Sequence, residues 1–342
     1  MPTLQVALLE GCEPARFARV EAGLLARGHP LPIRVIAGLA TPALLLGRHQ
    51  RAASAIDLAA TRARGLPVMR RAGGGRTLLV GEGTVGLFLH TPPGMPLSAA
   101  PFPPDRTTNR YVRGLLAALR SLGARQAAWF GRDFVSAGGR QLAAVSQEAT
   151  PDGAVALEAL LSVSLPLQPP PELLRAWPHS DPRAGGPAPV SLAELATRTP
   201  GFDEVAAALM AGWGGAGGPE PEPVDGELPE AELPPAEEDE AGLSASGPVE
   251  IPIGFLEALT AAASGRLVGP RLRGDYIAPA TAVAALEGSL DGAPIDPAEV
   301  GRRVNEAFHG PGAFIQGVME LGAVARAVLA AGRLAAGSTG VA

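Results

Sequence analysis

The residues best suited to chemistry are the run Arg70-Arg71-Ala72-Gly73-Gly74-Gly75. Three consecutive glycines let the backbone approach a ligand closely and expose its N–H groups to phosphate or carboxylate. The two arginines carry permanently charged, fork-shaped groups that bind the same anions. The run is therefore predicted to hold an anionic ligand, and a plain turn is the alternative interpretation in a chain this rich in glycine.

The chain contains no lysine, because all 28 of its basic residues are arginine. A GC-rich genome, which favours Ala, Gly, Pro and Arg codons, accounts for lysines missing from the surface. It accounts less well for a lysine missing from a site that needs a point charge or a titratable amine.

Composition argues against several classes of function. The 342 residues are enough for two domains, and the net charge of −6 without an evident basic face argues against a nucleic-acid partner. One cysteine, Cys12, excludes an internal disulfide, and His49, His90 and His179 lack metal-ligand spacing, so no metal site is expected. No signal peptide and no apolar run near the roughly 20 residues of a membrane span are found, which predicts a cytoplasmic protein without a membrane partner.

The elements that must position the glycine run are predicted from apolar spacing and from Gly and Pro. Residues 66–70 form a strand that leads into the run. Residues 126–135 hold two strands, and Gly138-Gly139 is a hairpin turn into a further strand at 140–145. These adjacent strands predict an α+β fold with a mixed or antiparallel sheet packed with helices, rather than a doubly wound parallel sheet.

Four segments are predicted along the chain. Residues 1–213 form the first domain. Residues 214–247 are rich in Gly, Pro, Glu and Ala and carry no basic residue, which predicts a disordered linker. Residues 248–335 form a small α+β accessory domain, with a hairpin across Ser264-Gly265 and three helices, and residues 336–342 are a flexible tail.

Several segments resemble, in order, the fold of lipoate–protein ligases, octanoyltransferases and biotin–protein ligases, and most of all the lipoate–protein ligase A branch. The segments that carry the resemblance are Gly47-Arg48-His49-Gln50, 68–75, 131–135, 139–143, 191–195, Arg273-Gly274-Asp275-Tyr276 and 290–292. Only the arginine–glycine loop is specific by itself. The resemblance implies a catalytic domain of the class II synthetase and biotin-ligase type over residues 1–213. It also implies that residues 248–335 are the C-terminal accessory domain of a lipoate ligase.

The resemblance also implies a reaction and its ligands. In this family ATP with Mg²⁺ activates lipoate or octanoate as an acyl-adenylate, and the acyl group then passes to a lysine of a lipoyl carrier domain. The implied partners are the carrier domains of a 2-oxoacid dehydrogenase E2 or of the glycine-cleavage H protein, and no tightly bound cofactor is expected. The loop residues Arg70, Arg71, Gly73, Gly74 and Gly75 are implied as ligand-binding. Asp133 is implied near the adenine, with the capping of a turn as its alternative role.

The chain departs from the family at the catalytic position. The family's essential lysine aligns with Gln141, whose amide donates N–H bonds but carries no charge. Removing one electrostatic donor typically costs about 10²–10³ in rate. Arg76 either replaces the missing charge or lies at the loop edge facing solvent, whereas Arg140 points to the opposite face of its strand. The family's His-Gly pair in a later strand appears as Glu158-Ala159.

Three hypotheses remain. The first is a divergent active ligase or acyltransferase that uses Arg70, Arg71 or Arg76 to stabilise charge. The second is a non-catalytic homologue that binds a lipoyl-like ligand, a nucleotide or a carrier domain. The third is a scaffold that binds a genuine ligase through the accessory domain. Fold does not decide among them, and lipoate, octanoate and biotin all remain open as the acyl group.

Overall fold

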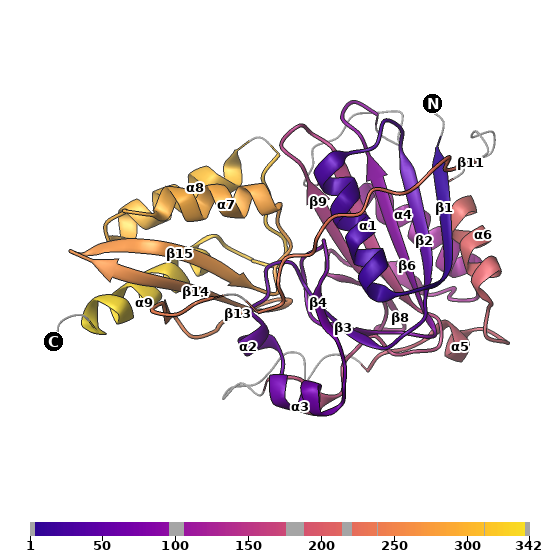
Figure 1. Ribbon diagram of the computed structural model, residues 1–342, viewed down its shortest axis with the longest axis horizontal. Coiled ribbons are helices and arrows are strands. Elements are labelled where there is room, and N and C mark those ends of the chain that lie inside the picture. The colour runs from indigo at the N-terminus through magenta and orange to yellow at the C-terminus, as the bar shows by residue number, and fades with distance from the viewer. Residues whose placement is uncertain are drawn as a thin grey trace.

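The computed structural model describes residues 4–95, 106–175, 188–213, 221–237, 239–310 and 312–338. His179 lies outside these ranges. A larger unit of sheet and helices lies beside a smaller unit that begins near Ser244 (Figure 1). None of the described helices is both long and apolar enough to span a membrane.

A mixed eight-stranded sheet forms the centre of the larger unit. Its strands are β1 (Gln5–Cys12), β2 (Ile33–Leu39), β6 (Thr84–Thr91), β7 (Ala127–Trp129), β8 (Phe134–Ala137), β9 (Arg140–Ala149), β10 (Val155–Ser162) and β11 (Glu222–Pro223). They lie in the order β11-β1-β2-β6-β10-β9-β8-β7. The β1 strand runs parallel to β2 and β11, whereas the other neighbours are antiparallel. The predicted α+β class and mixed sheet are therefore confirmed.

Helices cover both faces of this sheet because its strands alternate apolar side chains between two cores. On one face α1 (Pro14–Arg27) packs Phe17 and Leu24 against Phe88 of β6. On the other face lie α4 (Thr107–Ser121) and α6 (Phe202–Gly212), whose apolar side chains share a core with Leu87 of the same strand. The short helix α5 (Leu192–Leu195) begins at a capping box formed by Ser191 and Glu194.

A small second sheet carries the glycine run. It consists of β3 (Ala43–Leu46), with β4 (Val68–Arg70) parallel on one side and β5 (Leu78–Val80) antiparallel on the other. Around it lie the helices α2 (Ala52–Ala55) and α3 (Leu58–Ala63) and the 3₁₀ turn Pro171–Leu173. The run connects β4 to β5, so both of its ends are anchored on this sheet.

The smaller unit is a sheet with helices on two sides (Figure 1). Its elements are β12 (Ser244–Ala245), β13 (Val249–Ile251), β14 (Gly254–Ala263), β15 (Arg266–Gly274), α7 (Ala280–Leu290), α8 (Pro297–His309) and α9 (Gly322–Ser338). The β14–β15 hairpin turns at Ser264-Gly265, as the sequence predicts, and both turn residues have positive φ. The α9 helix reaches Ser338, so residues 336–338 of the predicted flexible tail are helical.

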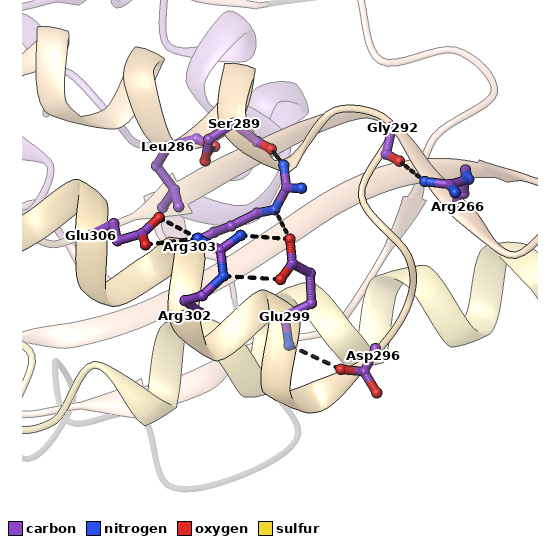
Figure 2. Close-up of polar contacts among 9 residues, drawn as sticks. All are labelled: Arg266, Leu286, Ser289, Gly292, Asp296, Glu299, Arg302, Arg303 and Glu306. Atoms are coloured by element: carbon purple, nitrogen blue, oxygen red, sulfur yellow. Dashed lines mark hydrogen bonds and ion pairs between the residues drawn. The ribbon is translucent and has the colours of Figure 1, made fainter.

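Figure 2 shows how α8 begins and how it is tied to α7. The Asp296 carboxylate accepts from the Glu299 N–H at 2.9 Å, and Pro297 takes the first helical position. The Glu299 carboxylate also accepts from Arg302 and Arg303, which lowers the pKa of Glu299 to about 2. Since Arg303 donates onward to the Ser289 carbonyl of α7, the cap and the helix pair form one polar network.

The described parts of the predicted linker, residues 221–237 and 239–247, contact the rest of the protein. Residues 221–237 lie against the larger unit, where β11 extends the main sheet beside β1, whereas β12 near the end of the segment pairs with β14 of the smaller unit. Glu230, for example, pairs with Arg16 and Arg19 of α1. Local composition predicts disorder because it counts only the apolar residues of the segment itself, whereas these acids find arginines far away in the sequence.

Candidate functional site

The glycine run is packed between the main sheet and the smaller unit. A Cβ atom at Gly73 would lie 2.0 Å from an Oε of Glu158, and one at Gly74 would lie 2.5 Å from the Tyr276 carbonyl oxygen. Gly75 has φ +89° and donates its N–H to that same carbonyl at 3.1 Å. Close packing on both sides therefore requires glycine here, and the run is more than an open surface turn.

Arg70 is a buried residue that holds backbone together. Its guanidinium donates to the carbonyl oxygens of Gly47 and Arg48 at 3.2 and 2.9 Å, and also to that of Gln50. A further N–H donates to the Ala236 carbonyl at 2.9 Å. These bonds tie the turn after β3 to the acidic segment. They engage Arg70 inside the protein, and the predicted contact with a ligand stays a prediction.

Arg71 belongs to a buried charge cluster under the loop. Its Nη1 lies 3.1 Å from an Oε of Glu158, and both side chains are only 3% exposed. Its Nη2 donates to the Arg76 carbonyl at 3.2 Å. Glu21 of α1 is fully buried beside this pair, and burial, followed by repulsion from the Glu158 charge, raises the pKa of Glu21 well above its usual value. The positive charge of Arg71 is thus neutralised by Glu158 on the side of the main sheet.

Arg76 faces the site and is paired there with Asp133. Its Nε and Nη2 bind the two carboxylate oxygens of Asp133 at 2.8 and 3.2 Å. Its guanidinium carbon lies 5.6 Å from the centre of the Phe134 ring. Arg76 is thus mostly covered and paired with Asp133, and the roles implied for both residues stay predictions.

Gln141 lies on the loop side of the main sheet. It faces Ser136 across the β8–β9 pair, and Ala144 faces Phe134, because a bulge at Leu142 shifts the register. Facing residues of an antiparallel pair share one side of the sheet, so Gln141 lies on the same face as Ser136 and Phe134. Arg76 stacks on the Phe134 ring and therefore covers this same face. Its neutral side chain is buried.

Arg140 points away from this face, as predicted. Its Nη2 lies 2.9 Å from Glu194 and donates to the carbonyl of Pro189, beside α5. Arg140 and Gln141 therefore lie on opposite faces of the sheet.

Two segments that carried the resemblance meet at the loop. The side-chain Nε2 of Gln50 donates to Asp275 at 2.6 Å, while its side-chain Oε1 accepts from the Gly47 N–H and the Thr77 hydroxyl at 2.8 and 3.0 Å. The Asp275 carboxylate also accepts from the Phe255 N–H at 2.9 Å. Asp275 is thus buried and links the two units by hydrogen bonds. The sequence pointed to this residue only through the family resemblance.

Two buried titratable residues, His49 and Glu148, also lie where the two units meet. The His49 ring stacks on Tyr276 at 4.8 Å, its Nε2 lies 2.9 Å from the Ala278 carbonyl oxygen, and burial lowers the pKa of His49 to about 3. Burial raises the pKa of Glu148 to about 7, and its carboxyl accepts from the Ala280 N–H at 3.0 Å. The sequence carried no signal for Glu148. Glu21 could have been noticed, because it stands four residues after Phe17 on the apolar face of its helix.

The described residues contain no group of three or more His, Cys, Asp or Glu side chains placed to hold a metal ion.

The fold and the sequence both resemble lipoate ligases. The family model for the lipoyl protein ligase A/B catalytic domain matches residues 26–213. The lipoate-bound crystal structure of LipL1 from P. falciparum superposes with a TM-score of 0.66 and 11% identity, over 89% of this chain and 94% of that one. A bipartite lipoate protein ligase from Thermoplasma acidophilum, described with its E2 lipoyl domain, gives a TM-score of 0.52 and 18% identity, over 62% of this chain and 83% of that one.

None of the curated proteins matches the chain in sequence. The family model nevertheless covers more than half of it, and the two structures share its fold. The chain therefore belongs to the lipoyl protein ligase A/B catalytic-domain family.

Proposed function

We propose that this protein is a lipoate–protein ligase-like protein whose ATP-dependent activation of lipoate or octanoate, and whose transfer of the acyl group to a carrier-domain lysine, are impaired. One observation carries the proposal. The arginines of the glycine loop are neutralised inside the protein, Arg71 by Glu158 and Arg76 by Asp133, while Gln141 supplies no charge.

The chemistry explains why this arrangement is limiting. Attack of a carboxylate on the α-phosphate of ATP builds negative charge on the phosphate and on the leaving group, and fixed positive groups must stabilise it. The family uses a lysine for this purpose. The net charge of the two ion pairs is zero, so they offer no excess positive charge to a triphosphate. The Asp133 carboxylate is already bound to Arg76 and is not available to magnesium. In this arrangement the four residues do not fit a magnesium-bound triphosphate.

Binding without turnover is the second candidate function. The loop keeps a defined shape through backbone bonds to β3 and to the turn after it, since the Arg71 N–H donates to the Leu46 carbonyl at 3.0 Å and the Arg48 N–H donates to the Gly73 carbonyl at 2.8 Å. A loop held in this way supports recognition of an acyl ligand, a nucleotide or a lipoyl carrier domain even where catalysis is weak.

The test uses the full chain with ATP, Mg²⁺ and either lipoate or octanoate. We expect pyrophosphate release and acylation of a lipoyl carrier domain to fall about 10²–10³ below those of a lysine-bearing ligase assayed beside it. Rates equal to that ligase would contradict the proposed impairment. Calorimetric titration of the same ligands separates the two candidates, because heat of binding without turnover indicates the second.

A further inference from the structure

A part of the chain that the proposed chemistry does not use is the acidic segment between the two units. We call its described residues, 221–237 and 239–247, the acidic strap. In Figure 1 the strap crosses α1 on the outside of the molecule and continues toward α2 and β13.

The strap carboxylates pair with arginines on α1 and α3 and at the N-terminal end of α2. Glu230 lies 3.2 Å from Arg16 and 2.9 Å from Arg19, both on α1. Two further pairs lie beyond this point, Glu237 with Arg62 of α3 at 2.7 Å, and Glu240 with Arg51 at the start of α2. The arginines therefore form a row on one surface, and the strap follows it.

Backbone contacts accompany these charges. The Ala231 N–H donates to the Arg19 carbonyl at 3.0 Å, and β11 pairs with the edge of β1. Gly23 lets the Pro229 carbonyl come so close that a Cβ there would lie 2.1 Å from its oxygen. Further along, Arg70 donates to the Ala236 carbonyl. The surface thus recognises an extended polypeptide, because it binds peptide groups as well as carboxylates.

The ion pairs of Arg16, Arg19 and Arg62 are open to water, whereas Arg51 is only 26% exposed and also lies 3.5 Å from Glu257. The side chains of Arg16, Arg19 and Arg62 are 51%, 41% and 69% exposed in their pairs, and exposed ion pairs contribute little to stability and are screened by salt. This contrasts with the buried pair of Arg71, which salt does not reach.

We propose that the arginine row formed by Arg16, Arg19, Arg51 and Arg62 is a docking surface for an extended acidic segment of another protein. The strap occupies this surface in cis as a substitute for that partner. A competing acidic chain replaces the carboxylates of Glu230, Glu237 and Glu240, and the strap detaches. The occupant is a polypeptide rather than a nucleic acid, because a phosphodiester chain offers no N–H to the Arg19 carbonyl and no strand to the β1 edge.

The experiment measures binding of fluorescent poly-L-glutamate to the full chain at low salt. One variant combines Glu230→Gln, Glu237→Gln and Glu240→Gln. Its matched control combines Asp225→Asn, Glu227→Gln and Glu232→Gln, which change the net charge equally in the same segment. We expect the first variant to bind at least roughly tenfold more tightly than the control, because the carboxylates of the strap no longer compete for the arginine row. Strap amides should also exchange hydrogen faster in the first variant.

Two results would overturn the proposal. Equal affinity of the two variants would show that net charge alone governs binding. Equally tight binding of a single-stranded DNA of matched charge would show that the surface selects charge and not peptide. Adding Arg16→Gln and Arg62→Gln to the first variant should abolish the gain, and retention of the gain would place the binding elsewhere.

Discussion

Arg71 and Glu158 form an ion pair of 3.1 Å directly beneath Gly73, where both side chains are 3% exposed. One partner comes from the loop and the other from β10 in the main sheet, so the pair fixes the loop to the sheet. The same contact neutralises a charge that the loop would otherwise offer to an anionic ligand. The contact that holds the loop in place therefore also removes the charge of Arg71 from ligand binding.

The first prediction concerns removal of one partner. Glu158→Gln leaves the Arg71 guanidinium buried without its counter-charge, which typically costs about 3–5 kcal/mol. We therefore expect a fall of that size in the free energy of unfolding, measured with denaturant. The double variant Arg71→Met/Glu158→Leu should recover most of the loss, because it removes both buried charges.

A surface pair provides the control for this cycle. Glu306→Gln removes a partner of Arg302 on the exposed side of α8, and we expect no measurable change there. If Glu158→Gln behaved like Glu306→Gln, the pair under Gly73 would not be buried as described.

The second prediction concerns the fit of the loop under the smaller unit. Gly74→Ala places a Cβ 2.5 Å from the Tyr276 carbonyl oxygen, which is backbone and cannot move alone. We expect a loss of about 1–3 kcal/mol in the free energy of unfolding, as for overpacking elsewhere. The control Gly301→Ala lies within α8 with open space around it and should stabilise the protein by about 0.5–1 kcal/mol. Equal effects of the two variants would contradict the described contact.

The third prediction concerns pH. The pKa of Glu148 is raised by burial to about 7 from its ordinary 4.5. Between these two values the folded state holds a proton that the unfolded state has lost, so stability falls as pH rises from 4.5 to 7. Glu148→Gln keeps an oxygen for the Ala280 N–H without the charge. We expect it to match the wild type at pH 5 and to exceed its melting temperature at pH 8.

The comparison between variant and wild type isolates Glu148. The lowered pKa of His49 acts in the opposite sense, since its contribution is present above pH 6.5 and is lost as pH falls toward 3. This term is common to both proteins and cancels. Parallel melting curves from pH 5 to pH 8 would show that Glu148 does not titrate in this range.

The sequence predicted those features that depend on neighbouring residues. The turns at Gly138-Gly139 and at Ser264-Gly265 are local, and the structure contains both of them. The mixed sheet also followed from successive hairpins.

Long-range partners could not be predicted in this way. Nothing near Gln50 in the sequence indicates that Asp275 is its hydrogen-bond partner. Likewise, the ion pairs of Glu230 with Arg16 and Arg19 join a low-complexity segment to a distant helix. Arg70 looked like an anion ligand because its type fits one, yet its burial among backbone carbonyls gives it a structural role.

The most direct test of the proposed impairment is the rate of pyrophosphate release from ATP with octanoate or lipoate in Gln141→Lys. The control is Arg140→Lys, which adds a lysine one residue away on the face that carries Glu194. We predict that Gln141→Lys raises the rate by about 10²-fold or more over the wild type and that Arg140→Lys leaves it unchanged. Equal rates in all three proteins would contradict the assignment of Gln141 as the position that limits the chemistry.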